Sequence, residues 1–551
     1  MTRGRKIALF TVGAILAVGG VEVYIAGKNL VKHFESMIRE QAITYLRERF
    51  DSEVEMSSLH VAIPALSPIK TFWNKGRGVL AQVEGKDLQL RHKGRTDIPP
   101  LFTLQSFRFE IDLGVLLESR RRVARVTLNG MQISIPPKGS RPRFGSSKKE
   151  ALAAGDRKEA KKDSGSVIVE EILVTNARLV ILPKDTKKIP LTFDIYSLHL
   201  DSAGKDVAMK YDAVLTNPKP AGKIRSKGTF GPWAAEDPGD TPLSGDYVFE
   251  DADLSVFKGI AGLLQSTGHF EGTLSTINVK GEARVPDFRL TMSGNRVPLS
   301  TMFEVGVDGT NGNTTLKPVY ATLGKTHFTV SGAVIKHLGD AQKAISLNAI
   351  MPKGRLEDLL RLAMKGTPMM EGEIFLKTKI EIPPLSSKVK EKLILDGDFK
   401  VLKGKMLRTT IQDKIDSLSR RAQGQPKNEE IDNVFAQMIG GFHLEDEAIA
   451  FRSLSFRVPG AAIYLAGDYK MNEDALDFHG NLRLEAKISQ TMTGWKRWVA
   501  KPLDPFFAKN GSGTFLHIKI EGSSKSPRFG LDRGRKDKAT FQTKSTSPQS
   551  K

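Results

Sequence analysis

Cysteine is absent from this chain of 551 residues. Its absence excludes disulfide bonds, iron–sulfur clusters, thiolate catalysis and cysteine-ligated zinc. Histidine is scarce, with ten residues, and no two of them stand at a metal-ligand spacing on one predicted helix or strand face. A Gly-x-Ser-x-Gly nucleophile elbow is also missing. We therefore expect a protein that is not an enzyme and that uses neither a metal nor a cofactor.

Two short glycine motifs do not change this expectation. Gly324-Lys325-Thr326 matches the end of a phosphate-binding loop, but Val319 stands where the earlier glycine is required and no helix pattern follows. The stretch 76–81 fits a loose dinucleotide-binding string outside any strand–turn–helix context, so we interpret it as a turn.

The sequence has one long hydrophobic run, from Ile7 to Ala26, and three basic residues precede it. A helix of this length just crosses the hydrocarbon core of a bilayer. We predict that residues 1–26 form a cytoplasmic tip and a transmembrane anchor. A competing interpretation is a signal peptide, because small residues such as Val18 and Gly20 suit a signal-peptidase site.

An amphipathic helix is predicted to follow the anchor over residues 27–50. Its apolar residues recur at spacings of three and four; they are Leu30, Phe34, Met37, Ile38, Ala42, Tyr45 and Leu46.

Alternation of apolar and polar residues then predicts β-strands in two regions, 51–140 and 166–532. Asn129-Gly130 predicts a hairpin, although a bulge in one long strand also fits. Because strands follow one another without crossover helices, we expect antiparallel pairing. Turns are expected at Asp308-Gly309 and at residues 311–313.

A few helices are expected to interrupt the strands. Asp253 is predicted to cap one that ends near Gly268, and a second is predicted around Leu356 to Ala363. The stretch Ile411 to Gly440 holds two further candidates on either side of a polar break.

The net charge of +21 is concentrated in three polar segments. Residues 1–6, 141–163 and 533–551 carry 12 of these charges, so we interpret 141–165 as a disordered basic linker and 533–551 as a disordered basic tail. Basic segments of this kind are attracted to anionic lipid headgroups. No recognition motif accompanies them, so we do not expect nucleic acid as a partner.

The order of these patterns resembles the AsmA-like family of bacterial envelope proteins. The residues that carry the resemblance are Tyr45–Phe50, Val54–Val61, Val123–Ile133, Asp477–Ala486, and Ile518–Gly522 with Pro527. The resemblance implies a single-pass inner-membrane protein with its body in the periplasm. It also implies a mostly β fold, in which a long curved, taco-like antiparallel sheet forms an apolar groove. Larger relatives are thought to conduct phospholipids between the two membranes, and some members affect outer-membrane assembly.

A sheet with one continuous apolar face must cover that face with another sheet, with helices or with a ligand. The predicted helices are few, so we expect part of the face to bind acyl chains, while a sandwich closed on itself is the competing interpretation. The expected lining residues are Leu59, Val61, Ile63, Val126, Leu128, Ile133, Ile135, Leu482, Leu484, Ile488, Leu516, Ile518 and Ile520.

Aromatic and basic residues alternate near the end of the chain, which is typical of a bilayer interface. A loop that packs its rings into the core would fit equally. The candidate interface residues are Trp495, Trp498, Phe506 and Phe507.

Together these patterns predict a membrane-anchored periplasmic protein that binds or passes phospholipid acyl chains and contributes to lipid transport and outer-membrane homeostasis. Its expected partners are phospholipid or another acyl-chain lipid, the inner membrane, and outer-membrane or envelope proteins. The alternative is a periplasmic scaffold that aids outer-membrane protein assembly.

Overall fold

The computed structural model describes most of the predicted β regions. The described residues are Ile43, Arg47 and the ranges 52–62, 80–92, 96–112, 121–135, 167–182, 189–203, 208–232, 234, 238–309, 312–336, 342–384, 389–428, 433–494, 496–504, 513–524 and 526–532.

Several predicted segments lie outside the described residues. These are the anchor within 1–26, the basic linker 141–165, the basic tail 533–551 and the first four residues of the turn predicted over 76–81. The last two residues of that stretch, Leu80 and Ala81, begin a strand, so the turn was wrong there. Of the predicted amphipathic helix only Ile43 and Arg47 are described, and both are helical. No helix within the described ranges has the length and apolar character needed to span a bilayer.

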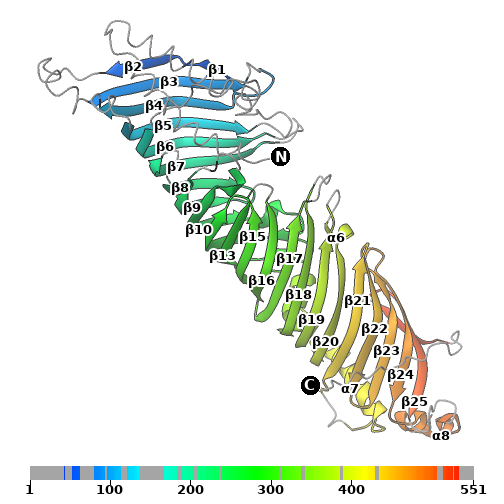
Figure 1. The fold of residues 1–551 in the computed structure, drawn as a ribbon. Helices are drawn as coiled ribbons and strands as arrows, with labels where there is room; N and C mark the ends of the chain where they lie inside the picture. The colour runs from blue at the N-terminus through cyan, green and yellow to red at the C-terminus, as the bar shows by residue number, and fades with distance from the viewer. Residues whose placement is uncertain are drawn as a thin grey trace, which may run out of the picture. The chain divides into compact units, whose positions relative to one another are not determined.

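The protein is mostly β, as predicted, and 24 of the described strands belong to one sheet (Figure 1). The sheet is mixed, because one pair of strands is parallel. The chain divides into two compact units. Unit 1 holds residues 1–288 and 300–317, and unit 2 holds residues 289–299 and 318–551.

In unit 1 most strands pair with their sequence neighbours and form a ladder in chain order, except that the first two strands both pair with the third and one two-residue strand lies outside this sheet. Its strands are β1 (Ser52–Glu55), β2 (Ser58–Ala62), β3 (Leu80–His92), β4 (Phe102–Asp112), β5 (Arg121–Ile135), β6 (Val167–Ile181), β7 (Leu191–Ala203), β8 (Met209–Pro218), β9 (Ala221–Phe230), β10 (Pro242–Asp253), β11 (Ile260–Ala261), β12 (Leu263–Thr273) and β13 (Thr276–Val285), with short 3-10 turns η2 (Pro238–Asp240) and η3 (Leu254–Val256).

The exception to antiparallel pairing is β5 with β6, which run parallel from Arg121 opposite Val167 to Ile135 opposite Ile181. The prediction of a purely antiparallel sheet was therefore wrong at this pair. A parallel pair requires the connecting chain to return to the starting end of the sheet. Alternation within the two strands does not specify that return.

Asn129-Gly130 forms no hairpin, because β5 runs without interruption through both residues. Ser106 still opposes Asn129 and Leu104 still opposes Met131, so the register does not shift as it would at a bulge. Gly130 has a φ of 67°, which bends the strand locally. One long strand is confirmed, whereas both the hairpin and the bulge were wrong.

The end of unit 1 and the start of unit 2 contain β14 (Arg289–Leu290), β15 (Leu299–Asp308) and β16 (Asn313–Leu323). The predicted turn between Asp308 and Asn313 is confirmed, since β15 ends and β16 begins there. It is closed by a 2.6 Å bond from the Gly312 amide to the Asp308 carbonyl.

Unit 2 contains a second ladder in chain order, in which all pairs are antiparallel (Figure 1). Its strands are β17 (Thr326–Ile335), β18 (Ala344–Arg355), β19 (Met370–Ile382), β20 (Ile394–Met406), β21 (Ala436–Glu445), β22 (Ala448–Val458), β23 (Ala461–Lys470), β24 (Ala475–Leu484), β25 (Thr514–Gly522) and β26 (Pro527–Leu531). Its helices are α5 (Leu356–Ala363), α6 (Val389–Lys392), α7 (Thr409–Ala422), η4 (Ile488–Thr491), α8 (Lys496–Ala500) and η5 (Lys501–Leu503).

Two of the helix predictions are confirmed and two are wrong. α5 and α7 occur as expected. Asp253 accepts a 2.8 Å hydrogen bond from the Ser255 amide and so caps a helical turn, as predicted. The turn is only the three-residue η3, and the longer helix predicted after it is not formed. Gly259 and Gly262 have φ values of 94° and 140°, which a helix cannot contain. The second candidate after the polar break is wrong, because Ala436 begins strand β21.

Candidate functional site

The strands of unit 2 have one apolar face and one polar face, because successive side chains of a strand point to opposite sides. Register shows which side chains share a side: Thr378 opposes Gly397, Gly397 opposes Phe442, and Phe442 opposes Phe451. The residues on this side, which we call the apolar face, are Ile345, Leu347, Ala349, Met351, Ile374, Leu376, Thr378, Ile380, Leu395, Gly397, Phe399, Val401, Met438, Gly440, Phe442, Leu444, Ile449, Phe451, Leu454, Phe456, Val458, Ala461, Ile463, Leu465, Gly467, Leu476, Phe478, Gly480, Leu482, Leu484, Leu516, Ile518 and Ile520.

Phenylalanine rings connect the apolar face across the strands. Phe399 on β20 lies 6.2 Å from Phe442 and 6.4 Å from Phe451, measured between ring centroids. Phe451 in turn lies 5.8 Å from Phe478 on β24. Glycine makes room for the rings: a Cβ at Gly440 would lie 3.0 Å from the Phe399 ring. The result is a continuous aromatic path over neighbouring strands.

Helices cover one end of the apolar face. Buried side chains from seven strands pack there with residues of α7, while Leu356, Leu359 and Leu360 of α5 add partly buried contacts. The buried residues of this covered end are Met351, Met370, Ile374, Val401, Ile415, Ala422, Ala436, Val458, Ala461 and Leu484.

Hydrogen bonds fasten α7 over that end. The carboxylate of Asp416, which is 4% exposed, accepts 3.0 Å bonds from the backbone amides of Asn433 and Val434. Gln412 donates to Asp416 at 2.8 Å and accepts from the Met406 amide at 2.9 Å. These bonds join the helix to the strands on either side of it, so the cover is a fixed part of the fold.

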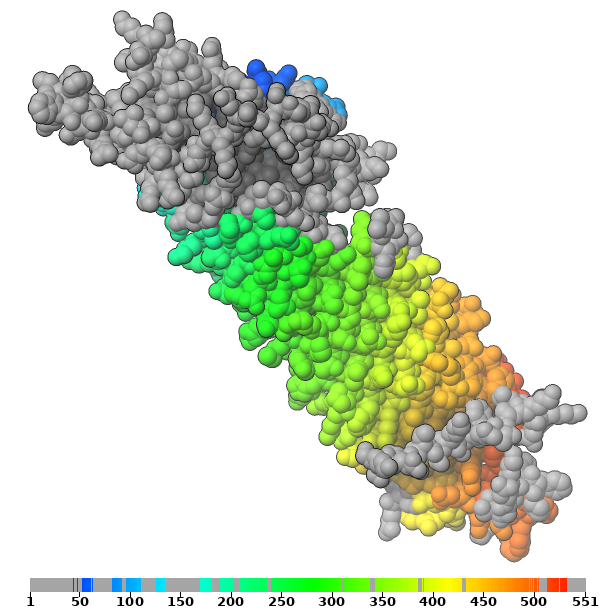
Figure 2. All heavy atoms as spheres, in the orientation of Figure 1, coloured from blue at the N-terminus to red at the C-terminus, as the bar shows by residue number. Residues whose placement is uncertain are grey.

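Away from α7 the apolar face is only partly covered. Leu395, Ile449 and Leu465 are half-buried, although their neighbours on the same side are also apolar. On the last strand, β26, Phe529 and Leu531 oppose Ile520 and Ile518 and are 75% and 50% exposed. Figure 2 shows unit 2 from one side, with its colours running from green to red in chain order. The described residues therefore give this part of the apolar face only a partial cover.

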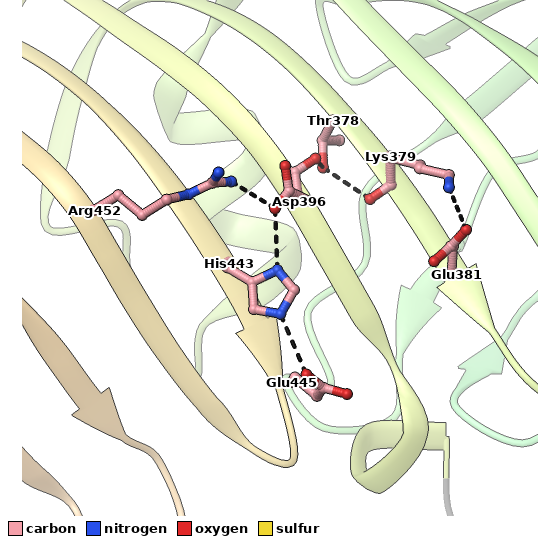
Figure 3. A network of polar contacts seen from close by, with 7 residues as sticks. All are labelled: Thr378, Lys379, Glu381, Asp396, His443, Glu445 and Arg452. Atoms are coloured by element: carbon pink, nitrogen blue, oxygen red, sulfur yellow. Dashed lines mark hydrogen bonds and ion pairs between the residues drawn. The ribbon is translucent and has the colours of Figure 1, made fainter.

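The opposite side of the same strands is charged. In the network of Figure 3, Asp396 accepts from Arg452 at 2.5 Å and lies 3.1 Å from Nδ1 of His443. The other ring nitrogen of His443 lies 3.3 Å from Glu445. Hydrogen bonds to Glu445 and Asp396 raise the pKa of His443, while the Arg452 hydrogen bond lowers the pKa of Asp396.

This network has the acid–histidine contacts of a catalytic site but not its nucleophile. The hydroxyl of Thr378 donates to the backbone carbonyls of Lys379 and Asp396, not to the imidazole. The charged groups are exposed, which weakens each contact. Among the described residues, no three His, Asp or Glu side chains are grouped to hold a metal ion. The arrangement is suited to cross-strand stabilisation.

Gly324-Lys325-Thr326 forms the turn between β16 and β17. Asp358 of α5 accepts from the Lys325 amide and from the Thr326 hydroxyl, both at 2.9 Å. A carboxylate therefore occupies the donors that a phosphate would need, so this motif is a capped turn.

Three predicted lining residues lie on the apolar face in its partly covered region: Leu516, Ile518 and Ile520. Leu482 is on the same face and half-buried, and it packs against the cluster at the covered end. Leu484 lies at the covered end. Ile488 does not extend the strand as predicted, because β24 ends at Leu484 and Ile488 begins η4. The Ala486 amide bonds to the Ala422 carbonyl at 2.8 Å, which turns the chain out of the ladder.

The predicted lining residues of unit 1 are in a different environment. Val126, Leu128 and Ile133 of β5 are 0%, 2% and 1% exposed. Leu59 is also buried. The side chains of Val61 and Ile135 and the whole of Ile63 lie outside the described part of the chain. Those that are described lie in a packed core.

Sequence reasoning missed the aromatic path of Phe399, Phe442, Phe451 and Phe478. The signal was present, because apolar residues alternate in Ile394–Met406 and Ala448–Val458. Bulges interrupt that alternation: the β22–β23 register shifts between Phe451 and Leu454. Of the predicted interface residues, Trp498 is exposed, while Trp495, Phe506 and Phe507 lie outside the described ranges.

Comparison with known proteins gives no match: no family model, no curated protein and no solved structure is similar to this chain.

Proposed function

We propose that this protein binds or passes the acyl chains of phospholipids on the apolar face of unit 2. We further propose that it does so as a membrane-anchored periplasmic protein with an AsmA-like, curved and groove-forming sheet, contributing to lipid transport and outer-membrane homeostasis. The supporting observation is the apolar face itself, which α5 and α7 cover at one end only.

The energetics favour an acyl chain as the occupant. Burial of apolar surface contributes about 25 cal/mol per Å², so a chain that buries a few hundred Å² gains several kcal/mol. Phenylalanine, leucine and isoleucine offer no directional polar contacts, which suits a ligand recognised by its apolar surface. Because these contacts are weak and spread over many side chains, they also permit the acyl chain to move along the apolar face.

Adjacent residues on β25 provide a matched test. Leu516 lies on the apolar face opposite Leu482, while the next residue, His517, lies on the polar side and is 2.8 Å from the Asn481 side chain. A photo-crosslinking amino acid replaces either residue in the full chain, in cells, and attached lipid is identified by mass spectrometry.

We expect lipid adducts from position 516 and background levels from position 517. Equal labelling at both positions, or none at either, contradicts the proposal. Adducts to proteins from position 516 without lipid would favour the alternative, a scaffold for outer-membrane protein assembly.

A further inference from the structure

A short helical tip connects β24 to β25, the two strands that carry Leu482 and Leu516. We call α8 (Lys496–Ala500) and η5 (Lys501–Leu503) the α8 tip. Side-chain contacts fix its position: Asp504 accepts from the Ser489 hydroxyl at 2.7 Å and from the Ser489 amide at 2.8 Å. Ala500 and Ser489 are buried, so the tip is packed against η4.

The outward side of the tip combines an aromatic ring with cations. Trp498 is 74% exposed, and Nζ of Lys501 lies 5.6 Å from the centroid of its ring. Lys496 and Lys501 are exposed, and Arg497 adds a third positive charge to the sequence of the tip. Asp504 is the one acidic residue of 496–504, and its carboxylate is bonded to Ser489.

This composition favours a bilayer surface over a protein partner. Tryptophan with lysine or arginine is the pairing that anchors proteins at the headgroup layer. Each basic side chain near an anionic surface also adds attraction. A tip of only eight residues offers little area for a stable protein interface, whereas a bilayer surrounds an inserted ring on every side.

We propose that the α8 tip docks on an anionic phospholipid bilayer, with Trp498 at the headgroup level and Lys496 and Lys501 beside lipid phosphates. The inference rests on the proposed function and extends it, because the tip belongs to the connection between β24 and β25, two strands of the apolar face. It identifies the place where a lipid exchanges between a bilayer and that face.

Depth-dependent fluorescence quenching tests the contact directly. The full chain, with Trp73, Trp233 and Trp495 each replaced by Phe, is reconstituted into phosphatidylcholine vesicles with or without phosphatidylglycerol, and both kinds carry brominated lipid. Trp498 is then the reporter. In the control chain Trp498→Phe is combined with Tyr464→Trp, which places the reporter on the exposed polar side of β23.

We expect quenching of Trp498 to exceed that of the control reporter by about threefold in vesicles with phosphatidylglycerol. The double variant Lys496→Glu, Lys501→Glu should lose at least about half of this Trp498 quenching. Lys227→Glu, which reverses an exposed charge in unit 1, should leave the quenching unchanged.

Equal quenching of the two reporters, or quenching that is indifferent to phosphatidylglycerol and to the charge reversals at the tip, overturns the docking proposal. Lipid adducts from position 516 are read separately. If docking fails while the adducts persist, the acyl-chain function stands and the exchange site lies elsewhere.

Discussion

Glycine residues on the apolar face allow neighbouring strands to approach more closely than any side chain would permit. A Cβ added at Gly480 would lie 1.8 Å from the backbone oxygen of Tyr464, and one at Gly467 would lie 2.1 Å from that of Asp477. Both contacts are with backbone atoms, which cannot rotate away. At these positions the close pairing of β23 and β24 requires glycine.

Gly480→Ala should therefore destabilise unit 2 by about 1–3 kcal/mol, the usual cost of overpacking. Gly306→Ala is the matched control, because a Cβ there meets no atom within 4 Å. Thermal unfolding followed by circular dichroism should show a lower transition temperature for the first variant only. Equal transitions for the two variants would mean that the strands can separate at Gly480 without cost.

At the residue scale, alternation in the sequence predicted Leu482, Leu516, Ile518 and Ile520 correctly as members of one side. It could not predict that Val126 lies in a packed core while Leu516 is half-buried, although the two strands have similar patterns. Exposure depends on what packs over a strand, and that is a tertiary property.

Among the elements, α7 decides how much of the apolar face is available. Leu418 and Ile411 pack on the cluster that includes Val401 and Ala436, while basic residues face away. Because Asp416 supplies the bonds that hold the helix, its loss should uncover this end.

Asp416→Ala leaves the amides of Asn433 and Val434 without their acceptor, and we expect the free energy of unfolding to fall by about 1–3 kcal/mol. We expect a lower unfolding temperature and stronger binding of an apolar dye such as ANS. Asp413→Ala removes an exposed carboxylate from the same helix and should have neither effect. If the two variants behave alike, α7 is held by its apolar contacts alone.

Prediction from sequence was accurate for elements with one strong local signal. α5 was predicted by its apolar stripe before Gly366, and the turn after Asp308 by its glycines. The prediction of a helix after Asp253 was wrong because Gly259 and Gly262 redirect the chain, which the apolar spacing alone did not reveal. The prediction of antiparallel pairing was wrong for β5 and β6 because the direction of pairing is set between strands that are distant in the sequence.

At the scale of the whole molecule, the polar side is held by charges that bridge neighbouring strands. His443 lies between Asp396 and Glu445, and His479 lies between Asp477 and Asp532. Hydrogen bonds to Glu445 and Asp396 raise the pKa of His443, and those to Asp532 and Asp477 raise the pKa of His479.

A raised pKa makes the folded state bind its proton more tightly than the unfolded state does. The stabilisation is fully present below the ordinary value of 6.5 and is lost as the pH rises through the raised values. The unfolding temperature should therefore fall between pH 6 and pH 9, and fall less in a His443→Gln, His479→Gln variant. If the unfolding temperature falls with pH equally in the unmodified protein and in the double variant, the pH dependence belongs to other groups.

The fold class as a whole was predictable because alternation persists over most of the chain, whereas the division into two units was not. The polar network of Figure 3 could not be predicted from the sequence either, because Arg452 and Asp396 come together only through the pairing of β20, β21 and β22.

The ladder order of unit 2 has a consequence for how the chain acquires its structure. From β17 to β26 strands that are consecutive in the chain are bonded to each other, so each pairing joins parts of the chain that are near in sequence. Such an arrangement resembles a stack of repeats, in which growth proceeds by adding one unit to a finished neighbour. During synthesis from the N-terminus, each new strand of this ladder can therefore pair with the strand made before it, without waiting for the last residue.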